Sequence, residues 1–394
     1  MKKIIIFLSI ILIFILLAGG VYFFVLRDGS STTANPGFNF DGSPITITQD
    51  DSIDFVVDST PIKESTTLTQ IHEAPVAGAS AYTSEVLVAV GSTTEARLST
   101  FVQYVDKQTG HVFSYSPEEN VSERISNTTF PGIQEVGWFT DPNKLVFRYI
   151  NGDGEIETYL GEIVDGSLVG SYLDIDLPST QTSDNSLLTV SSTDRGSEGF
   201  ILNNEGREER SSFETNLLSF TVPVFAESFV AVLTKPASSL AGALYFYENE
   251  TQQRILGNKN GLTALPNKTG DYVIFSESTD RSFMSSIYSR ETGDMRPLPL
   301  SILPEKCVWA SETTAYCMVP EIVPPANYPE HWYQGYVSFN DSLWRIFVDE
   351  GSAQAIAFFD ESGPFDGINL SIDSDEEYLT FINRRDGSLW GFDL

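Results

Sequence analysis

The stretch VGWFTDPNKLVFRY (136–149) contains the unit that decides the fold. Two short apolar runs, rich in Val, Phe and Tyr, flank a polar turn around Asp141. Runs of β-branched and aromatic residues bounded by turn residues are typical of β-strands rather than helices. The stretch therefore predicts two antiparallel strands joined by a tight turn.

This unit recurs at a nearly constant spacing. Its turn falls at Asp141, Asp184, Glu227, Gly270, Glu312 and Ser374, in steps of 43, 43, 43, 42 and 62 residues. An earlier copy, SAYTSEVLVAVG (80–91), centres on Ser84, which makes seven copies. Further strand–turn–strand pieces, such as YVDKQTGHVF (104–113) and FVDEGSAQAI (347–356), lie between the turns. Four strands in about 40–45 residues are the signature of a propeller blade. We predict an all-β, seven-bladed β-propeller, or six or eight blades if the first repeat is misassigned.

The last copy, which begins at NLSIDSDEEYLTFIN (369–383), ends with the chain after only three strands. A blade that lacks its outer strand leaves an unpaired edge, which natural sheets avoid. Upstream of the repeats, the segment Ile45 to Val57 contains two short pieces that alternate like strands, Ile45 to Thr48 and Ile53 to Val57. We expect this segment to supply the missing strand and close the ring.

The segment DEEYLTFINRRDGSLWGFDL (375–394), with its D-G-x-L-W and D-L pattern, resembles the WD-repeat-like propellers of the Tol-system type. LTQIHEAPVAGA (68–79) and CVWASETTAYCMVP (307–320) are similar to segments of uncharacterised, membrane-anchored bacterial propellers. The resemblance covers roughly residues 65–394. It implies the fold and leaves the function open, because propellers host many activities.

The N-terminus is predicted to be a membrane anchor. Residues 4–26 are almost entirely apolar and would rise roughly 34 Å as a helix, enough to cross a bilayer core of about 30 Å. Lys2 and Lys3 precede the run, so the positive-inside rule places the N-terminus in the cytoplasm. A cleaved signal peptide is the alternative, but its apolar region is usually shorter. We expect an uncleaved single-pass anchor over residues 1–27, a stalk over 28–64 and an extracytoplasmic propeller over 65–394.

The charge of the chain excludes one class of partner. It has 23 Lys and Arg against 54 Asp and Glu, a formal net charge of −31. Nucleic-acid binding needs a basic surface that displaces counterions, so no nucleic acid is expected as a partner. The bilayer around residues 4–26, and an envelope protein or glycan, are the partners that we expect.

Two cysteines flank one of the repeated turns. With a loop at Ser311 to Thr313, residues whose numbers sum to 624 face each other, and Cys307 and Cys317 satisfy this sum. Cross-strand neighbours are close enough for a disulfide, and an extracytoplasmic location permits it. Two buried free thiols are the alternative. We predict the disulfide, with a modest effect on stability because its loop is short.

The step of 62 residues contains an insertion of about twenty, within VPEIVPPANYPEHWYQGYVSFNDSLW (319–344), between the second and third strands of one blade. Its aromatic residues and histidine are the candidate binding residues: Tyr328, His331, Trp332, Tyr333 and Tyr336. Long loops in compact domains are often functional, and aromatic side chains suit protein or carbohydrate contacts. The alternative is that these rings pack the loop onto its own blade.

Motifs for catalysis and for cofactors are missing. The sequence has no G-x-S-x-G, no H-E-x-x-H and no P-loop, and its three His and two Cys leave few transition-metal ligands. NGDGEIE (151–157) imitates the start of a calcium loop, but Ile156 stands where Gly is needed. Two acidic clusters offer at most weak Ca²⁺ binding: Asp50, Asp51 and Asp54, and Asp373, Asp375, Glu376 and Glu377. We assign no catalytic residue, metal or cofactor.

We therefore expect a membrane-anchored binding or scaffolding module of the bacterial cell envelope, without catalysis. One alternative is an enzyme acting on envelope polysaccharide through carboxylates in the propeller channel. The other is a structural subunit of a surface assembly, which would self-associate.

Overall fold

The computed structural model describes residues 45–46, 55–63, 67–90, 93–173, 179–249, 251–359 and 362–394. The predicted anchor over residues 4–26 lies outside these ranges. Within them, no helix combines the length and the apolar character needed to span a membrane.

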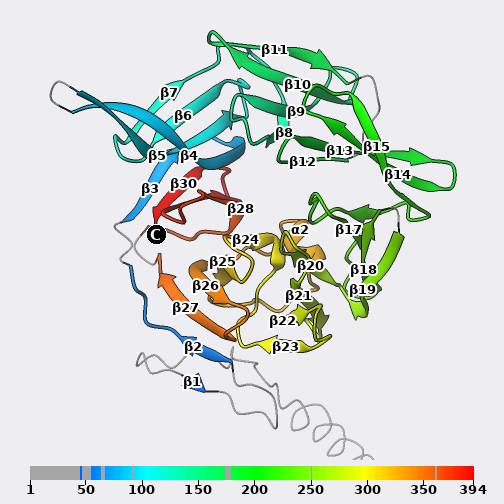
Figure 1. The fold of residues 1–394 in the computed structure, drawn as a ribbon. Coiled ribbons are helices and arrows are strands. Elements are labelled where there is room, and N and C mark those ends of the chain that lie inside the picture. The colour runs from blue at the N-terminus through cyan, green and yellow to red at the C-terminus, as the bar shows by residue number, and fades with distance from the viewer. Residues whose placement is uncertain are drawn as a thin grey trace, which may run out of the picture. The chain divides into compact units, whose positions relative to one another are not determined.

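Seven β-sheets are arranged in a ring, which confirms the predicted seven-bladed propeller (Figure 1). Six blades take four consecutive strands each from the chain. The first three comprise β4 (Val76–Val90), β5 (Thr93–Asp106), β6 (Val112–Ser116) and β7 (Val121–Arg124); β8 (Ile133–Trp138), β9 (Lys144–Ile150), β10 (Ile156–Val164) and β11 (Ser167–Tyr172); and β12 (Ser179–Ser183), β13 (Ser186–Thr193), β14 (Gly196–Asn203) and β15 (Glu208–Thr215). The next three comprise β16 (Phe220–Thr221), β17 (Val230–Thr234), β18 (Ala241–Glu248) and β19 (Thr251–Asn260); β20 (Thr263–Pro266), β21 (Tyr272–Thr279), β22 (Ser282–Ser289) and β23 (Met295–Leu298); and β24 (Cys307–Trp309), β25 (Thr314–Pro320), β26 (Asp341–Phe347) and β27 (Ser352–Ala357).

The seventh blade closes the ring with strands from both ends of the repeat region. It combines β28 (Gly367–Ile372), β29 (Tyr378–Asn383) and β30 (Leu389–Asp393) with β3 (Leu68–His72), which pairs antiparallel with β30. The prediction that the segment from Ile45 to Val57 closes the ring is therefore wrong. Within that segment, β2 (Val56–Asp58) instead pairs parallel with β27 of blade six, and β1 (Ile45–Thr46) pairs with β2.

The second strand of each blade explains why the repeat could be recognised in the sequence. In β29 all six residues are buried, and in β9 the four residues Leu145 to Arg148 are buried. Such strands are covered by neighbouring blades on both faces, so their apolar residues run consecutively instead of alternating with polar ones. In blades two to six the tight turn before the second strand recurs every 42 or 43 residues, which gives the repeat its period.

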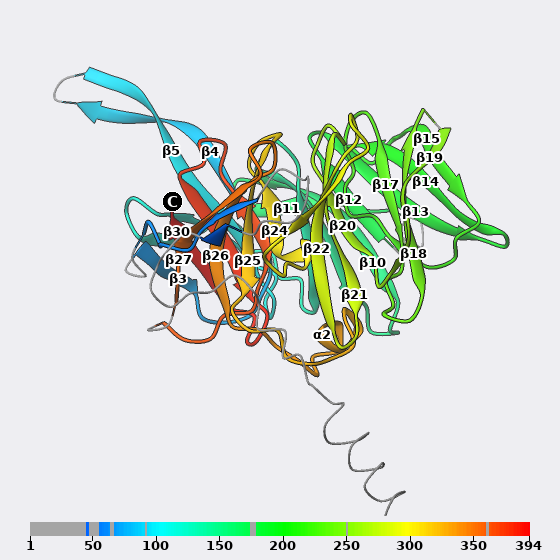
Figure 2. The ribbon, with the colours of Figure 1, turned by 90° about the horizontal axis from the view of Figure 1, so that it is seen from below.

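The first repeat differs from the expectation. Ser84 was predicted at a turn, but it lies inside β4, which continues to Val90 and pairs with β5 as far as Val90 opposite Thr93. With 15 and 14 residues, β4 and β5 are the longest strands in the described part of the chain. Their shared hairpin projects beyond the ring (Figure 2).

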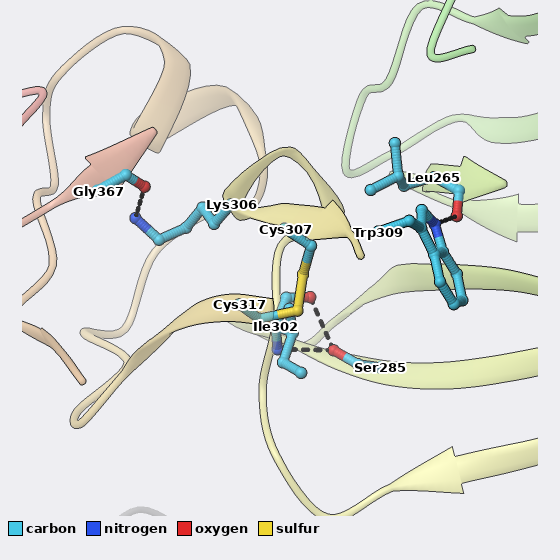
Figure 3. Close-up of a disulfide and its surroundings, with 8 residues drawn as sticks. All are labelled: Leu265, Ser285, Ile302, Lys306, Cys307, Trp309, Cys317 and Gly367. Atoms are coloured by element: carbon cyan, nitrogen blue, oxygen red, sulfur yellow. Dashed lines mark hydrogen bonds between the residues drawn. A yellow bond between two sulfur atoms is a disulfide. The ribbon is translucent and has the colours of Figure 1, made fainter. Parts of the chain in front are cut away.

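The predicted disulfide is confirmed. Cys307 lies directly opposite Cys317 in the β24–β25 register, with 4.1 Å between their Cα atoms, and the two sulfur atoms are bonded. Figure 3 shows the bond next to Ile302, whose backbone N–H and C=O both bond the hydroxyl of Ser285 in blade five. The disulfide is thus part of the packed boundary between blades five and six.

The ring has two unlike faces. In each four-stranded blade, the first-to-second and third-to-fourth connections lie at one end of the strands, and the second-to-third connection lies at the other. The β4–β5 hairpin belongs to the first end, and the insertion between β25 and β26 belongs to the second. In Figure 2 the hairpin and the insertion helix α2 (Glu330–Tyr333) accordingly lie on opposite sides of the ring.

The closing strand provides a direct test of this topology. Ile71 of β3 is buried against blade seven, whereas its neighbour Gln70 is exposed. We expect Ile71→Asp to lower the free energy of unfolding by several kcal/mol, because it places an unpaired charge in the core. Gln70→Asp, the matched control in the same strand, should change it by about 0.5 kcal/mol or less. Equal effects in thermal or urea unfolding would show that β3 does not close the ring.

Candidate functional site

The insertion between β25 and β26 forms a strap, residues 321–340, across one face of the ring. Its ends are fixed by the pairing of Pro320 with Asp341 and by the hydrogen bond from Glu321 N to Asn340 O, at 2.9 Å. Pro324, Pro325 and Pro329, all on the N-terminal side of the single-turn helix α2, keep that part of the strap from forming a longer element. The location between the second and third strands of a blade is as predicted.

The underside of the strap is a small hydrophobic core. Tyr328, Trp332 and Phe339 are at most 3% exposed. The rings of Tyr328 and Phe339 stack with their centroids 5.8 Å apart, and Phe283 of blade five meets Tyr328 edge-on at 4.9 Å. These rings attach the strap to the neighbouring blade as well as to its own.

A fully buried ion cluster lies beneath these rings. The ammonium group of Lys306 is 2.7 Å from an oxygen of Asp341 and 2.6 Å from an oxygen of Asp366, and it donates to the carbonyl of Gly367 at 2.9 Å. Figure 3 shows the Lys306 side chain reaching from the start of β24 to Gly367 in blade seven. An ammonium group has three donors, so all of its hydrogen-bonding capacity is used.

The strap is bonded to the same cluster. The carboxylate of Asp366 accepts hydrogen bonds from Trp332 Nε1 at 3.0 Å, from Ser338 Oγ at 3.1 Å and from Phe339 N at 3.3 Å. A buried carboxylate needs such donors, because desolvation without partners costs several kcal/mol. Asp366 therefore joins the strap, Lys306 of blade six and blade seven at one point.

Burial raises the pKa of both carboxyl groups, but their net shifts are opposite. For Asp366, burial favours the neutral form, but the charge of Lys306 and the donors around the carboxylate outweigh it and hold its pKa below the usual range. For Asp341, burial dominates and raises the pKa to about 6, although Lys306 opposes the shift. The second oxygen of Asp341 has no hydrogen-bond partner among the described residues, which leaves its ionised form poorly compensated.

Contacts to four blades hold the strap in place. On blade seven, Arg384 donates to Tyr333 O at 3.0 Å and its guanidinium lies 5.0 Å from the centre of the Trp332 ring. On blade five, the N–H of Ala326 donates to Arg281 O at 3.0 Å. Further hydrogen bonds extend from blade seven through blade six to blade four: Arg385 to Phe339 O, Tyr333 Oη to Glu305 of blade six, Arg281 to Pro325 O, Ser278 to Tyr328 O, and Ser238 to Glu330.

The outer side of the strap presents apolar groups to solvent. Tyr336 and Ile322 are each 76% exposed, and Tyr333 is 41% exposed. The ring of His331, which is half-buried, meets Tyr336 edge-on with 5.6 Å between centroids. The backbone that carries these side chains is held in place by the buried residues on the underside of the strap.

The five candidate binding residues thus fall into two groups. Tyr328 and Trp332 pack inward, as the alternative interpretation of the loop expected, while Tyr333, Tyr336 and the edge of His331 face outward. A binding role for the outward group stays a prediction. Sequence reasoning missed Lys306, Asp341 and Asp366, because no local pattern marks three charges that meet only through the fold.

A separate cleft lies mainly between blades three and four, at the end of the strands where the first strand of each blade turns into the second. It has a volume of about 890 Å³, and its apolar wall includes Phe229 and Tyr247. Its charged lining residues are Asp184, Glu227, Arg210 and Lys268. In the part of the chain that the structure describes, no three His, Cys, Asp or Glu side chains form a group that could hold a metal ion.

Comparisons with known proteins support the fold alone. No family model matches the chain, and a search of curated proteins finds no match. Among solved structures, U3-55K matches with 10% sequence identity and a TM-score of 0.50, over 84% of this chain and 99% of that one. A chain of the mitotic checkpoint complex matches with 8% identity and a TM-score of 0.50, over 91% of this chain and 98% of that one. At such identities the likeness is one of architecture and carries no function.

The ion cluster predicts a specific pH dependence. A carboxyl group whose pKa is higher in the folded chain favours folding below its unfolded pKa, and this contribution is lost as the pH rises through the folded value. With Asp341 near 6 when folded, the protein should lose about 1 kcal/mol of unfolding free energy between pH 5 and pH 8 from this group. Asp341→Asn removes that loss, whereas Asp349→Asn, at an exposed position of the same blade, should follow the unmodified protein.

Urea unfolding of the three proteins at both pH values makes the comparison. Relative to the unmodified protein, Asp341→Asn should have a higher free energy of unfolding at pH 8 than at pH 5. A difference that is the same at pH 5 and pH 8 would contradict the raised pKa of Asp341.

Proposed function

We propose that this chain is a binding module of the bacterial cell envelope, held to the membrane by residues 4–26, which captures a partner on the face that carries the strap. The main support for this function is that the two sides of the strap differ. Its underside is fixed by a buried ion cluster and by contacts to four blades, while its outer side exposes Tyr336, Tyr333 and Ile322. The partner is an envelope protein or a glycan.

A fixed aromatic surface is well suited to binding. Tyr is enriched among the residues that dominate binding energy, because it buries a large ring and also offers a hydroxyl group. A side chain held on an ordered backbone loses less conformational entropy when a partner binds. Burying the charges that hold the strap in place is unfavourable, and so is exposing apolar side chains to water. Both features are explained if the exposed side chains bind a partner.

Point variants of the outer side test this function. Deleting the whole strap would uncover Lys306 and Asp366, so loss of binding after deletion would not separate binding from folding. Tyr336→Ala with Ile322→Ser should instead leave the melting temperature unchanged and reduce capture of the partner by about tenfold or more. Tyr172→Ala, on the outer strand of blade two, is the matched control.

Capture is measured by crosslinking the full-length chain in its own membrane and quantifying the recovered proteins and glycans. Loss of the same molecules in the strap variant, but not in the Tyr172 control, supports the proposal. Unchanged recovery with the strap variant contradicts it.

The cleft between blades three and four favours a second candidate function, an enzyme acting on envelope polysaccharide. Two carboxylates and two basic side chains line a cleft of the size of ligand sites. Glycoside cleavage needs a pair of carboxyl groups, for which Asp184 and Glu227 are the candidates.

Incubation of the purified protein with isolated envelope polysaccharide, followed by measurement of new reducing ends, tests this second function. An enzyme should release reducing ends that the variant with Asp184→Asn and Glu227→Gln does not, whereas the exposed Asp194→Asn control should remain active. If the unmodified protein releases none, the cleft is not a glycosidase site for that polysaccharide.

A further inference from the structure

The β4–β5 hairpin forms an arm, residues 82–90 and 93–101, that extends beyond the first blade. The third strand of the blade, β6, pairs with β5 only from Val102 to Val105. Among the described residues, no strand pairs with β5 on that side from Thr94 to Phe101. The arm is therefore a two-stranded ribbon with an open edge.

The base of the arm is held firmly. The hydroxyl of Thr100 donates to a carboxylate oxygen of Asp373 in blade seven at 2.7 Å. The rings of Tyr82 and Phe101 stack across the two strands with their centroids 5.9 Å apart. The hydrogen bond of Thr100 ties the base of the arm to blade seven, and the arm projects from the ring as Figure 2 shows.

The outer part of the arm exposes apolar side chains. Leu87 is 74% exposed, Leu98 60% and Val88 38%. An isolated two-stranded ribbon is marginally stable in water, and an open, apolar edge is a template for pairing with another strand. The arm carries no proline, and no bulge occurs in its β4–β5 register to blunt this edge.

We propose that two copies of this chain associate through their arms, with the β5 edges pairing antiparallel about a two-fold axis at Ala96. In this register Glu95 lies opposite Arg97 of the second copy, and Arg97 lies opposite Glu95 of the second copy. The two arms then form one four-stranded sheet. Isologous pairing of this kind uses the same surface of both molecules, as most homodimers do.

Charge complementarity selects this register over its neighbours. A two-fold axis at Arg97 would set Arg97 against Arg97, and an axis at Glu95 would set Glu95 against Glu95. An axis between residues would place each charge opposite an uncharged residue. Directly opposed charges of unlike sign stabilise antiparallel sheets, whereas like charges destabilise them. The Ala96 register is therefore the favoured one.

The same register also completes an apolar row on the other face of the arm. Leu87 lies opposite Ala96 within one arm. Pairing at the two-fold axis places the two Ala96 residues side by side, so that the row runs from Leu87 through both Ala96 residues to Leu87 of the second copy. Small residues at the centre let the two strands approach, and the flanking Leu side chains are withdrawn from water.

Cysteine crosslinking of the full-length chain in its membrane tests the axis. Ala96→Cys should give a disulfide-linked dimer on a non-reducing gel, because residues directly opposite in a sheet come within disulfide distance. Thr94→Cys, on the same face of the same strand, should remain monomeric because it lies opposite Leu98 of the second copy. No crosslink at position 96, equal crosslinking at both positions, or crosslinking only with Leu87→Cys at the other edge would each overturn the proposal.

Charge reversal tests the pairing independently. Glu95→Arg and Arg97→Glu should each weaken the dimer by about tenfold, because two opposed pairs become repulsive. The two single variants mixed together should form a heterodimer, and the double variant should dimerise as the unmodified protein does.

The ion pair of Arg97 with Glu118, at 3.0 Å, is exposed, so its loss should leave the melting temperature nearly unchanged. Association of the detergent-solubilised chain is followed by light scattering. Failure of the mixture and of the double variant to restore dimers, with folding intact, would contradict the register.

Discussion

The ammonium group of Lys306 is the group on which the strap side of the ring depends. It is completely buried, and a buried charge is tolerated only with close partners of opposite sign. Those partners are Asp341, where the strap returns to its blade, and Asp366, which also binds Trp332 and Phe339 of the strap. One cation thus connects blade six, blade seven and the insertion. The exposed tyrosines owe their fixed position to this arrangement.

Closure of the ring is a second constraint. It determines on which face of the ring the strap and the arm lie. Because β3 completes blade seven, the first blade begins at Val76 and its first hairpin is free to extend into the arm. The strap lies at one end of the strands and the arm at the other (Figure 2). A partner on the strap and a second copy on the arm would therefore not compete for the same surface.

The periodic features of the fold were predictable because they are local. The turn spacing gave the blade number, and the numbering across one turn gave the facing pair Cys307 and Cys317. The closing strand was not predictable, since Ile45–Val57 and Leu68–His72 are both short strand-like segments and only long-range pairing distinguishes them. The aromatic residues of the strap could be listed from the sequence, but which of them are buried and which are exposed could not be predicted, because Trp332 is held inward by Asp366, which pairs with Lys306 sixty residues away.

Hydrogen–deuterium exchange shows whether the strap is a fixed part of the ring. The amides of Ala326, His331 and Gln334 all donate hydrogen bonds within the folded protein. They should exchange slowly, at rates close to those of β25 and β26, because opening them requires breaking the buried cluster. Exchange as fast as that of the exposed turn at Asp349 and Glu350 would show that the strap is a loosely attached loop and that the ion cluster does not fix it.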